Sequence, residues 1–200
     1  MTGVQTCALP ICLVTELIDG PGLDEVADEG RVDVAAAALI AVELFGAVRA
    51  LHRRGLAHLD VKPENVIVRD GRAILIDFGS ARPLGRPQPP GYPVGTAGFA
   101  APELEAGHPI AAGMDVFGVA ATVLAALAAD PVSATTVSAA AVRAARPQVL
   151  TEPGAEELLA ALTAMTAPDP AARPDVSAAL QSLADLFDPA GRPWPAGLIP

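Results

Sequence analysis

The sequence predicts an α+β fold that is mainly α-helical. Apolar residues recur at helical spacing in residues 33–54, 155–167 and 175–187, and residues 114–129 are apolar on nearly all sides, as in a buried helix. Two β-rich runs on either side of an Asp-Gly pair predict a hairpin. With 200 residues, 52% of them hydrophobic and 18% charged, the chain is long and apolar enough for one domain with a core.

The first quarter of the chain is expected to hold a strand, a short helix and a long helix. Residues 12–18 are an apolar, β-rich run before a turn and predict the strand, and residues 23–29 predict the short helix. Asp33 is placed to cap the long helix of residues 33–54, and Gly55 is placed to end it.

The hairpin has residues 66–68 and 73–76 as its strands. Asn65 therefore enters the hairpin where Asp77 leaves it, and both side chains are expected to reach one site. Residues 82–93 contain five prolines and two glycines, which predicts a loop without regular structure.

Composition and charge exclude several classes of protein. The net charge of −10 argues against nucleic acid as the main partner, because phosphate backbones are bound by basic faces. Two cysteines are too few for a disulfide framework, and a cytoplasmic location is predicted. No run reaches the roughly 18 unbroken apolar residues of a membrane span, residues 116–129 coming closest. We therefore expect no membrane segment in this chain, although an anchor could lie outside it.

The two ends of the chain differ from the rest. Residues 1–11 resemble the translation of a short-read sequencing adaptor, and we predict that they are not native. Residues 12–187 would then be a partial domain. Residues 188–200 are rich in proline and glycine and predict a tail or linker.

Polar residues of four kinds, carboxylate, lysine, asparagine and histidine, gather around the hairpin at fixed spacing. Together with the residues that follow the hairpin they are, in chain order, His58, Asp60, Lys62, Asn65, Asp77, Phe78 and Gly79. This set resembles the catalytic half of a eukaryotic-like (Hanks-type) bacterial serine/threonine protein kinase. The resemblance extends over most of the chain, through a Gly-Thr-Ala-Gly-Phe-Ala-Ala-Pro-Glu segment that is similar to the end of a kinase activation segment.

The resemblance implies ATP and Mg²⁺ as cofactors and a role for each polar residue. Asp60 would accept the proton of the substrate hydroxyl, and Lys62 would offset charge on the transferring phosphate. Thr96 would hydrogen-bond both of them. Asn65 and Asp77 would bind Mg²⁺ through oxygen atoms and so complete the contacts to ATP.

Further residues receive binding and structural roles from the same resemblance. The backbone from Glu16 to Ile18 would bind adenine, with Thr15 as gatekeeper. His58 would pack beneath Phe78 and Gly79, and it is expected to be structural rather than a metal ligand. Two more structural roles follow. Glu103 and Arg173 would form an ion pair, and Asp115 would hold the backbone of the catalytic loop.

Two departures from the kinase pattern stand out. Leu59 replaces the arginine that precedes the catalytic aspartate and pairs with a phosphorylated activation loop in the family. The sequence also lacks the glycine-rich loop and strand lysine of an N-terminal lobe. We therefore interpret the chain as a C-terminal-lobe fragment that lacks the N-lobe. We expect it to be inactive by itself and to bind ATP weakly, since phosphoryl transfer depends mainly on positioning.

The predicted function of the full-length parent is phosphorylation of protein serine and threonine, with a protein substrate as partner. A pseudokinase or scaffold module is one alternative. A small-molecule phosphotransferase of the aminoglycoside or choline kinase type is another, and Lys62 with residues 95–103 argues against it. His52 and His108 have no ligand partners at useful spacing.

Overall fold

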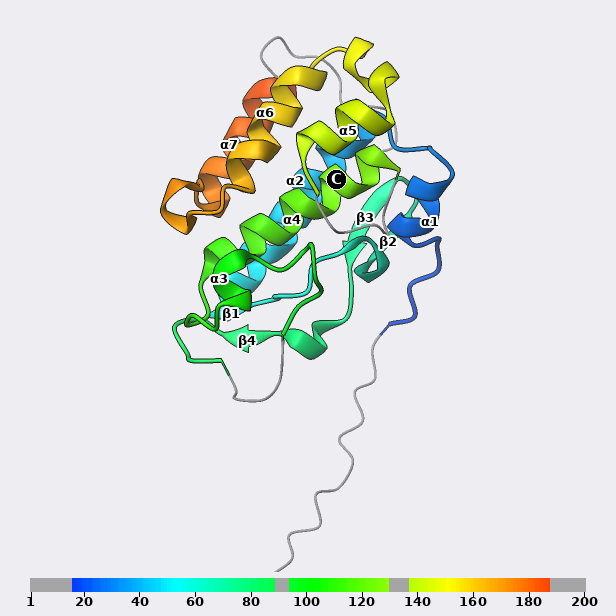
Figure 1. Cartoon of the computed structure of the whole chain (residues 1–200). Coiled ribbons are helices and arrows are strands. Elements are labelled where there is room, and N and C mark those ends of the chain that lie inside the picture. The colour runs from blue at the N-terminus through cyan, green and yellow to red at the C-terminus, as the bar shows by residue number, and fades with distance from the viewer. Residues whose placement is uncertain (1–15, 89–93, 130–136, 188–200) are drawn as a thin grey trace, which may run out of the picture.

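Figure 1 shows a computed structural model of the chain, which describes residues 16–88, 94–129 and 137–187. The architecture is mainly helical, as the sequence predicts, and it contains two small antiparallel sheets. The helices are α1 (Leu23–Asp28), α2 (Val34–His52), α3 (Pro102–Glu105), α4 (Ala112–Ala128), α5 (Ala139–Ala145), α6 (Ala155–Met165) and α7 (Val176–Phe187). The strands are β1 (Leu56–Ala57), β2 (Val66–Arg69), β3 (Arg72–Leu75) and β4 (Arg82–Pro83).

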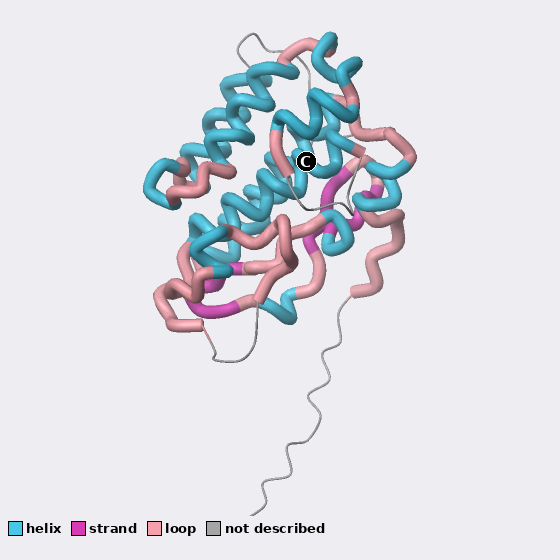
Figure 2. The backbone as a smooth tube through the Cα atoms, viewed as in Figure 1, coloured by secondary structure: helices cyan, strands magenta, loops and turns pink. Residues whose placement is uncertain are grey.

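Helix α4 lies at the centre of the fold, as Figure 2 shows, with α2, α6 and α7 stacked around it. Val119, Val123 and Leu124 have no exposed surface, which agrees with a helix predicted to be buried. Its apolar residues surround nearly the whole helix because neighbours cover it on several sides. The core therefore lies within the helical layer, and the small sheets border it.

Helix α2 begins and ends where the sequence predicts. The Asp33 side chain accepts a hydrogen bond from the backbone N–H of Ala36 at 2.7 Å, which is an N-cap. Gly55 follows the helix with φ of +74°, a conformation that glycine adopts at little cost. Leu44 and Phe45 are fully buried against the core.

Helix α2 is also long and apolar enough to cross a membrane by length and composition, with a mean hydropathy of 2.0. Among the described residues it is the one helix that meets both measures, so the expectation that residues 116–129 come closest to a span is wrong. Half of its apolar window is buried inside the fold against α4, α7 and β3. Such burial is typical of a core helix.

The β2–β3 hairpin confirms the Asp-Gly prediction. Val66 pairs with Leu75 and Arg69 with Arg72, and the turn residues Asp70 and Gly71 have φ of +52° and +76°. Two positive φ values define the type I′ turn that matches the twist of a hairpin. The backbone N–H of Ile76 donates to the carbonyl of Asn65 at 2.9 Å, so the hairpin's two ends adjoin.

Two predictions about backbone structure are wrong. Arg82 and Pro83 form β4, which pairs with β1, although residues 82–93 were expected to hold no regular element. A proline is tolerated here because the ladder is two residues long and Pro83 sits at its end. Residues 89–93 of that stretch lie outside the described residues.

The second error concerns the strand predicted over residues 12–18. Residues 16–18 are not in a strand, and residues 12–15 lie outside the described part of the chain. A strand needs a partner for its N–H and C=O groups. Within the described residues, this part of the chain meets β2 only further on, at the Gly22–Ile67 bridge and the Val68 N–H to Pro21 carbonyl bond.

Candidate active site

The loop between β1 and β2 carries the predicted catalytic residues, and one buried carboxylate accepts hydrogen bonds from its backbone. Asp115, in the first turn of α4, is 1% exposed. Its Oδ2 accepts from the His58 N–H and its Oδ1 accepts from the Leu59 N–H, each at 2.8 Å. Leu59 has φ of +70°, which an L-residue adopts at a cost of about 1 kcal/mol or more. Asp115 therefore holds a strained backbone immediately before Asp60.

The carboxylate of Asp60 receives donors on both oxygens. Thr96 Oγ1 donates to Oδ1 at 2.7 Å, and Asn65 Nδ2 approaches Oδ2 at 3.3 Å. The same amide also donates to the Asp60 carbonyl at 2.9 Å. These bonds fix the direction of a carboxylate that remains partly exposed.

Lys62 completes this group from the other side. Its Nζ donates to Thr96 Oγ1 at 3.0 Å and lies 3.8 Å from Asp60 Oδ2. One hydroxyl therefore donates to the aspartate and accepts from the lysine. The structure thus brings together Asp60, Lys62, Asn65 and Thr96, although Thr96 is 34 residues beyond Lys62.

His58 occupies the structural position that the resemblance implies. Its Nδ1 accepts from the Asp60 N–H at 3.4 Å, so Nε2 carries the proton and donates to the Ile76 carbonyl at 3.1 Å. The Phe78 ring packs edge-on at 5.3 Å between centroids. His58 therefore links the catalytic loop to the chain that leads into Asp77.

The Asp77-Phe78-Gly79 segment is more open. Asp77 adopts a left-handed conformation with φ of +59°, and its Oδ1 accepts from the Gly79 N–H at 3.0 Å. Its side chain is exposed, and Phe78 is 49% exposed. The hydrogen bond uses Oδ1, so the other carboxylate oxygen of this exposed residue is available to a ligand.

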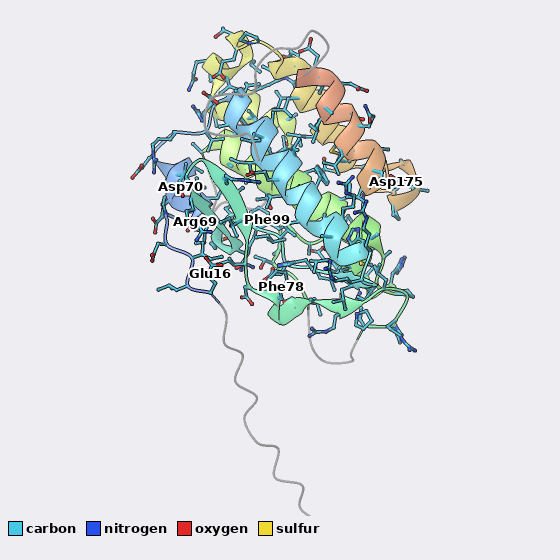
Figure 3. The ribbon with its side chains drawn as sticks, turned by 180° about the vertical axis from the view of Figure 1, so that it is seen from behind. Glu16, Arg69, Asp70, Phe78, Phe99 and Asp175 are labelled. Atoms are coloured by element: carbon cyan, nitrogen blue, oxygen red, sulfur yellow. The ribbon has the colours of Figure 1, made fainter. Side chains whose placement is uncertain are left out.

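A groove of about 640 Å³ runs beside this segment. Glu16, Leu17 and Ile18 line one part of it, and the end of the hairpin with Asp77 lines the rest. In Figure 3, Glu16 and Arg69 lie on the same flank, where Arg69 Nη1 donates to Glu16 Oε1 at 3.1 Å. The segment predicted to bind adenine and the predicted metal ligand Asp77 therefore share one mainly apolar groove. Asn65, the other predicted metal ligand, is not among the residues that line it, and Thr15 lies outside the described residues.

Asn65 and Asp77 suit a magnesium ion in their chemistry. Carboxylate and amide oxygens are hard ligands, and the two bonds of Asn65 to Asp60 use its Nδ2 and leave Oδ1 for a ligand. In the described ranges, no three or more His, Cys, Asp or Glu side chains are arranged so that they could hold a metal ion among themselves. Magnesium bound by one or two protein oxygens takes its remaining ligands from water and substrate phosphates, so this donor set fits.

Beyond the catalytic group, a buried ion pair joins α3 to the chain before α7. Arg173 Nη1 and Nη2 donate to Glu103 Oε1 and Oε2 at 2.6 and 2.8 Å. The guanidinium also donates to three backbone carbonyls and lies 5.0 Å from the centroid of the Phe117 ring. Every charged oxygen and most N–H groups of this buried pair are satisfied, which is the condition for such a pair to be stable.

Sequence reasoning missed one contact at this site. His52 Nε2 lies 2.8 Å from Asp115 Oδ2. The expectation for His52 concerned metal ligands only, so this hydrogen bond was not foreseen and does not contradict it. The two residues are 63 positions apart, so no local pattern reveals the pair. The sequence offers one indirect indication of this contact, because His52 and Asp115 each belong to a segment that is expected to lie beside the catalytic loop.

Leu59 also has surroundings that the sequence does not show. It is 4% exposed and belongs to an apolar cluster made by the catalytic loop, the activation segment and the start of α4. We call this set the Leu59 cluster. Its fully buried or nearly buried members are Ala57, Leu59, Val94, Ala100, Ala101, Leu104, Ile110 and Met114.

Comparison with known proteins agrees with this geometry. The protein kinase domain family matches residues 5–183, a range that contains every site residue from Glu16 to Arg173. The match begins within residues 1–11, and the adaptor origin of those residues stays a prediction.

Individual relatives are serine/threonine protein kinases. The chain is 36% identical over 118 residues to serine/threonine-protein kinase PkaA of Streptomyces coelicolor, covering 54% of this chain and 21% of the relative. It is 39% identical over 95 residues to serine/threonine-protein kinase PknL of Mycobacterium tuberculosis, covering 46% and 24%. It is 32% identical over 121 residues to serine/threonine-protein kinase D of Synechocystis, covering 56% and 23%. The matched stretches span about a fifth to a quarter of these relatives' lengths. Since the family match extends over most of the chain, this chain belongs to the protein kinase family.

Proposed function

We propose that the whole protein is a serine/threonine protein kinase that transfers the γ-phosphoryl group of ATP to a protein hydroxyl. One observation carries the proposal: the Thr96 hydroxyl donates to Asp60 and accepts from Lys62. This arrangement holds a carboxylate and an ammonium group on either side of one position, as a proton acceptor and a charge-stabilising donor require. The serine/threonine specificity named for the relatives supports the substrate class.

The proposed step uses these residues as follows. The substrate hydroxyl oxygen bonds to the γ-phosphorus, the bond from that phosphorus to the β,γ-bridging oxygen breaks, and the proton passes to the Asp60 carboxylate. Lys62 Nζ, 3.8 Å from Asp60 Oδ2, is placed to donate to a phosphate oxygen. Asn65 and Asp77 would hold Mg²⁺, which supplies charge neutralisation when bound.

The groove beside Asp77 is the proposed adenine site. Its apolar lining by Leu17, Ile18 and Ile67 suits a flat base, and the backbone of residues 16–18 offers hydrogen-bonding groups. Two further proposals accompany it: a cytoplasmic location, and domain boundaries at residues 12 and 187. The weak ATP binding expected for the 200 residues alone stays a prediction that calorimetry can measure.

The deciding experiment incubates the whole protein with labelled ATP and Mg²⁺ in the presence of protein, aminoglycoside and choline acceptors. The proposal expects label on serine and threonine of the protein acceptor. Label on a small molecule alone would show a small-molecule phosphotransferase. ATP binding without transfer to any acceptor would show a pseudokinase or scaffold module.

We also propose that activation-loop phosphorylation does not switch this kinase on. The Leu59 cluster joins the catalytic loop to the activation segment through apolar contacts. Leu59 stands at the sequence position of the arginine that pairs with a phosphorylated activation loop in the family. Phosphatase treatment of the whole protein is expected to leave its turnover unchanged. A treated form that loses most of its activity, and regains it on phosphorylation, would refute this.

A further inference from the structure

The stretch that connects the Asp77-Phe78-Gly79 turn to Thr96 has an unusual composition. Residues 81–95 contain no serine, threonine, aspartate or glutamate. A serine/threonine kinase therefore finds no acceptor of its own kind in this stretch, and the stretch supplies no carboxylate that could take the place of a phosphate. Leu59 also lacks the guanidinium that would pair with a phosphate. Other contacts must therefore hold this part of the activation segment.

The backbone of this stretch is held by neutral hydrogen bonds as far as Arg86. The Leu84 N–H donates to the Gly55 carbonyl at 2.8 Å, next to the β1–β4 pair. The Gly85 N–H then donates to the Ile110 carbonyl at 2.8 Å, and the Ile110 N–H donates to the Arg86 carbonyl at 2.9 Å. In Figure 1, α3 and the β1–β4 pair accordingly lie at the same end of the molecule.

Gln88 adds a side-chain contact where this described stretch ends. Its Nε2 donates to the Leu104 carbonyl in α3 at 2.7 Å and to the His108 carbonyl at 2.9 Å. An amide NH2 group carries two hydrogens, so both donors are used. Because both partners are acceptors, a side chain without N–H groups could not make either bond. The position therefore requires a donor, which is a chemical requirement that packing alone does not impose.

The place to which Gln88 binds is itself well anchored. Leu104 is 2% exposed within the Leu59 cluster, and α3 also carries one half of the buried ion pair described above. In the sequence, Pro87 and Pro89 flank Gln88, and a proline restricts both its own backbone and that of the residue before it. Ordering a chain with few accessible backbone conformations costs less entropy. Two neutral bonds from one side chain are therefore enough to hold this stretch against α3.

We propose that Gln88 is a positioning residue that holds the activation segment through neutral hydrogen bonds, in the place of a phosphate contact. By tying the segment to α3, it favours the arrangement in which the Thr96 hydroxyl joins Asp60 and Lys62. The effect on turnover rests on the proposed function, whereas the hydrogen bonds of Gln88 can be tested without kinase activity.

The side-chain amide of Gln88 in the unaltered protein gives the first test. Hydrogen exchange of its NH2 protons, measured by NMR on the whole protein, is compared with that of Gln148, which is exposed. The Gln88 protons are expected to exchange about tenfold more slowly, because both are hydrogen-bonded. Equal exchange rates for the two side chains would overturn the proposal.

Exchange of the Gly85 N–H tests whether this contact orders the segment. Its rate is compared with that of Val123, whose buried place in α4 makes it a probe of global opening. Gln88→Met keeps the length of the side chain without its N–H groups and is expected to raise this ratio about tenfold. Gln88→Lys keeps N–H donors and is expected to hold the ratio within about threefold of the unaltered protein.

Controls and opposite outcomes separate a hydrogen-bonding role from simple packing. Gln148→Met, at an exposed glutamine, is expected to leave the ratio unchanged. If Gln88→Met does not fold, Gln88→Ala takes its place, and if neither folds the exchange of the Gln88 side chain decides alone. A ratio that is unchanged in the Met variant, or equally raised in the Lys variant, would contradict the proposal.

Turnover of the whole protein extends the test to function. Gln88→Met is expected to lower kcat for a protein acceptor about fivefold, and Gln88→Lys to recover most of the loss. The KM for ATP should stay within about twofold, since Gln88 does not line the groove proposed for adenine. If the unaltered protein transfers no phosphoryl group, the proposed function fails, while the exchange rates still judge the role of Gln88. An equal fall in kcat for the Met and Lys variants would assign Gln88 a packing role instead.

Discussion

The catalytic loop and the Asp77-Phe78-Gly79 segment meet at the β2–β3 hairpin, and their surroundings are very different. The loop lies over α4, where Asp115 holds two of its N–H groups and Thr122 Oγ1 donates to the Val61 carbonyl at 3.1 Å. The Asp77 segment is exposed, and among the described residues the polar and aromatic contacts of its side chains are a bond within its own turn and one aromatic edge contact.

This difference separates two tasks of the same site. The proposed proton acceptor is positioned by hydrogen bonds of a loop that is anchored in the helical core, so a change in its geometry would break several of them. The proposed metal ligand Asp77 is positioned by local contacts, so its geometry changes at small cost. Substitutions in the two regions should therefore affect different quantities.

Asp115→Ala is the strongest test on the buried side. It leaves the N–H groups of His58 and Leu59 and the Nε2–H of His52 without an acceptor, and we expect the free energy of unfolding to fall by about 3–5 kcal/mol. Urea unfolding followed by circular dichroism measures the change. Asp185→Ala, at an exposed position on α7, serves as control with a change of less than about 0.5 kcal/mol. A loss under about 1 kcal/mol in the Asp115 variant would remove the distinction between the regions.

Asp60→Asn tests the acceptor that the buried side positions. The amide keeps the size of the side chain but cannot take up a proton, so phosphoryl transfer by the whole protein should fall about 10²- to 10⁴-fold. Transfer of labelled phosphate to a protein acceptor measures this. Asp70→Asn, in the exposed hairpin turn where φ is +52°, should retain full activity. Equal activity in both variants would argue against Asp60 as the acceptor.

Leu59→Arg tests the apolar contact between the catalytic loop and the activation segment. A guanidinium in place of a side chain that is 4% exposed would be buried among apolar residues, at a cost of about 2–4 kcal/mol. Thermal and urea unfolding measure the loss. The same change at Leu17, which is 82% exposed, should alter stability by less than about 0.5 kcal/mol. If the two variants were equally stable, the Leu59 cluster would make no measurable contribution to the free energy of unfolding.

Asp77→Asn should have the smallest effect on stability. Asparagine tolerates the left-handed conformation and can still accept from the Gly79 N–H, so we expect a change within about 0.5 kcal/mol. Binding of Mn²⁺ in the presence of ATP, followed by water proton relaxation on the whole protein, should weaken about tenfold because a charged ligand is lost. Unchanged metal binding would move the metal site elsewhere.

Local signals in the sequence predicted the parts of the fold that depend on a few adjacent residues. The Asp33 cap and the Asp70-Gly71 turn are of this kind, since each is determined by backbone conformation within four residues. The β1–β4 pair depends instead on two segments that lie far apart in the chain, and a proline there argued against a strand. Helix α5 was missed because alanines dominate it and give no clear apolar periodicity.

The site also has features that the sequence predicts and features that it does not. The spacing of Asp60, Lys62 and Asn65 is visible in the sequence because one short loop carries all three. The role of Thr96 came only from the resemblance, since nothing in the spacing shows that it returns to Asp60. The His52–Asp115 contact and the apolar surroundings of Leu59 arise from packing between distant segments, which no single-sequence pattern encodes.

The apolar character of α2 has a consequence for how the protein is made. The helices that cover it, α4 and α7, follow it in the chain, so the ribosome releases α2 before its partners exist. During that interval a nascent helix with a mean hydropathy of 2.0 presents an uncovered apolar face to chaperones and to membranes. Biosynthesis of this kinase therefore passes through a stage at which α2 must be shielded until α7 has emerged.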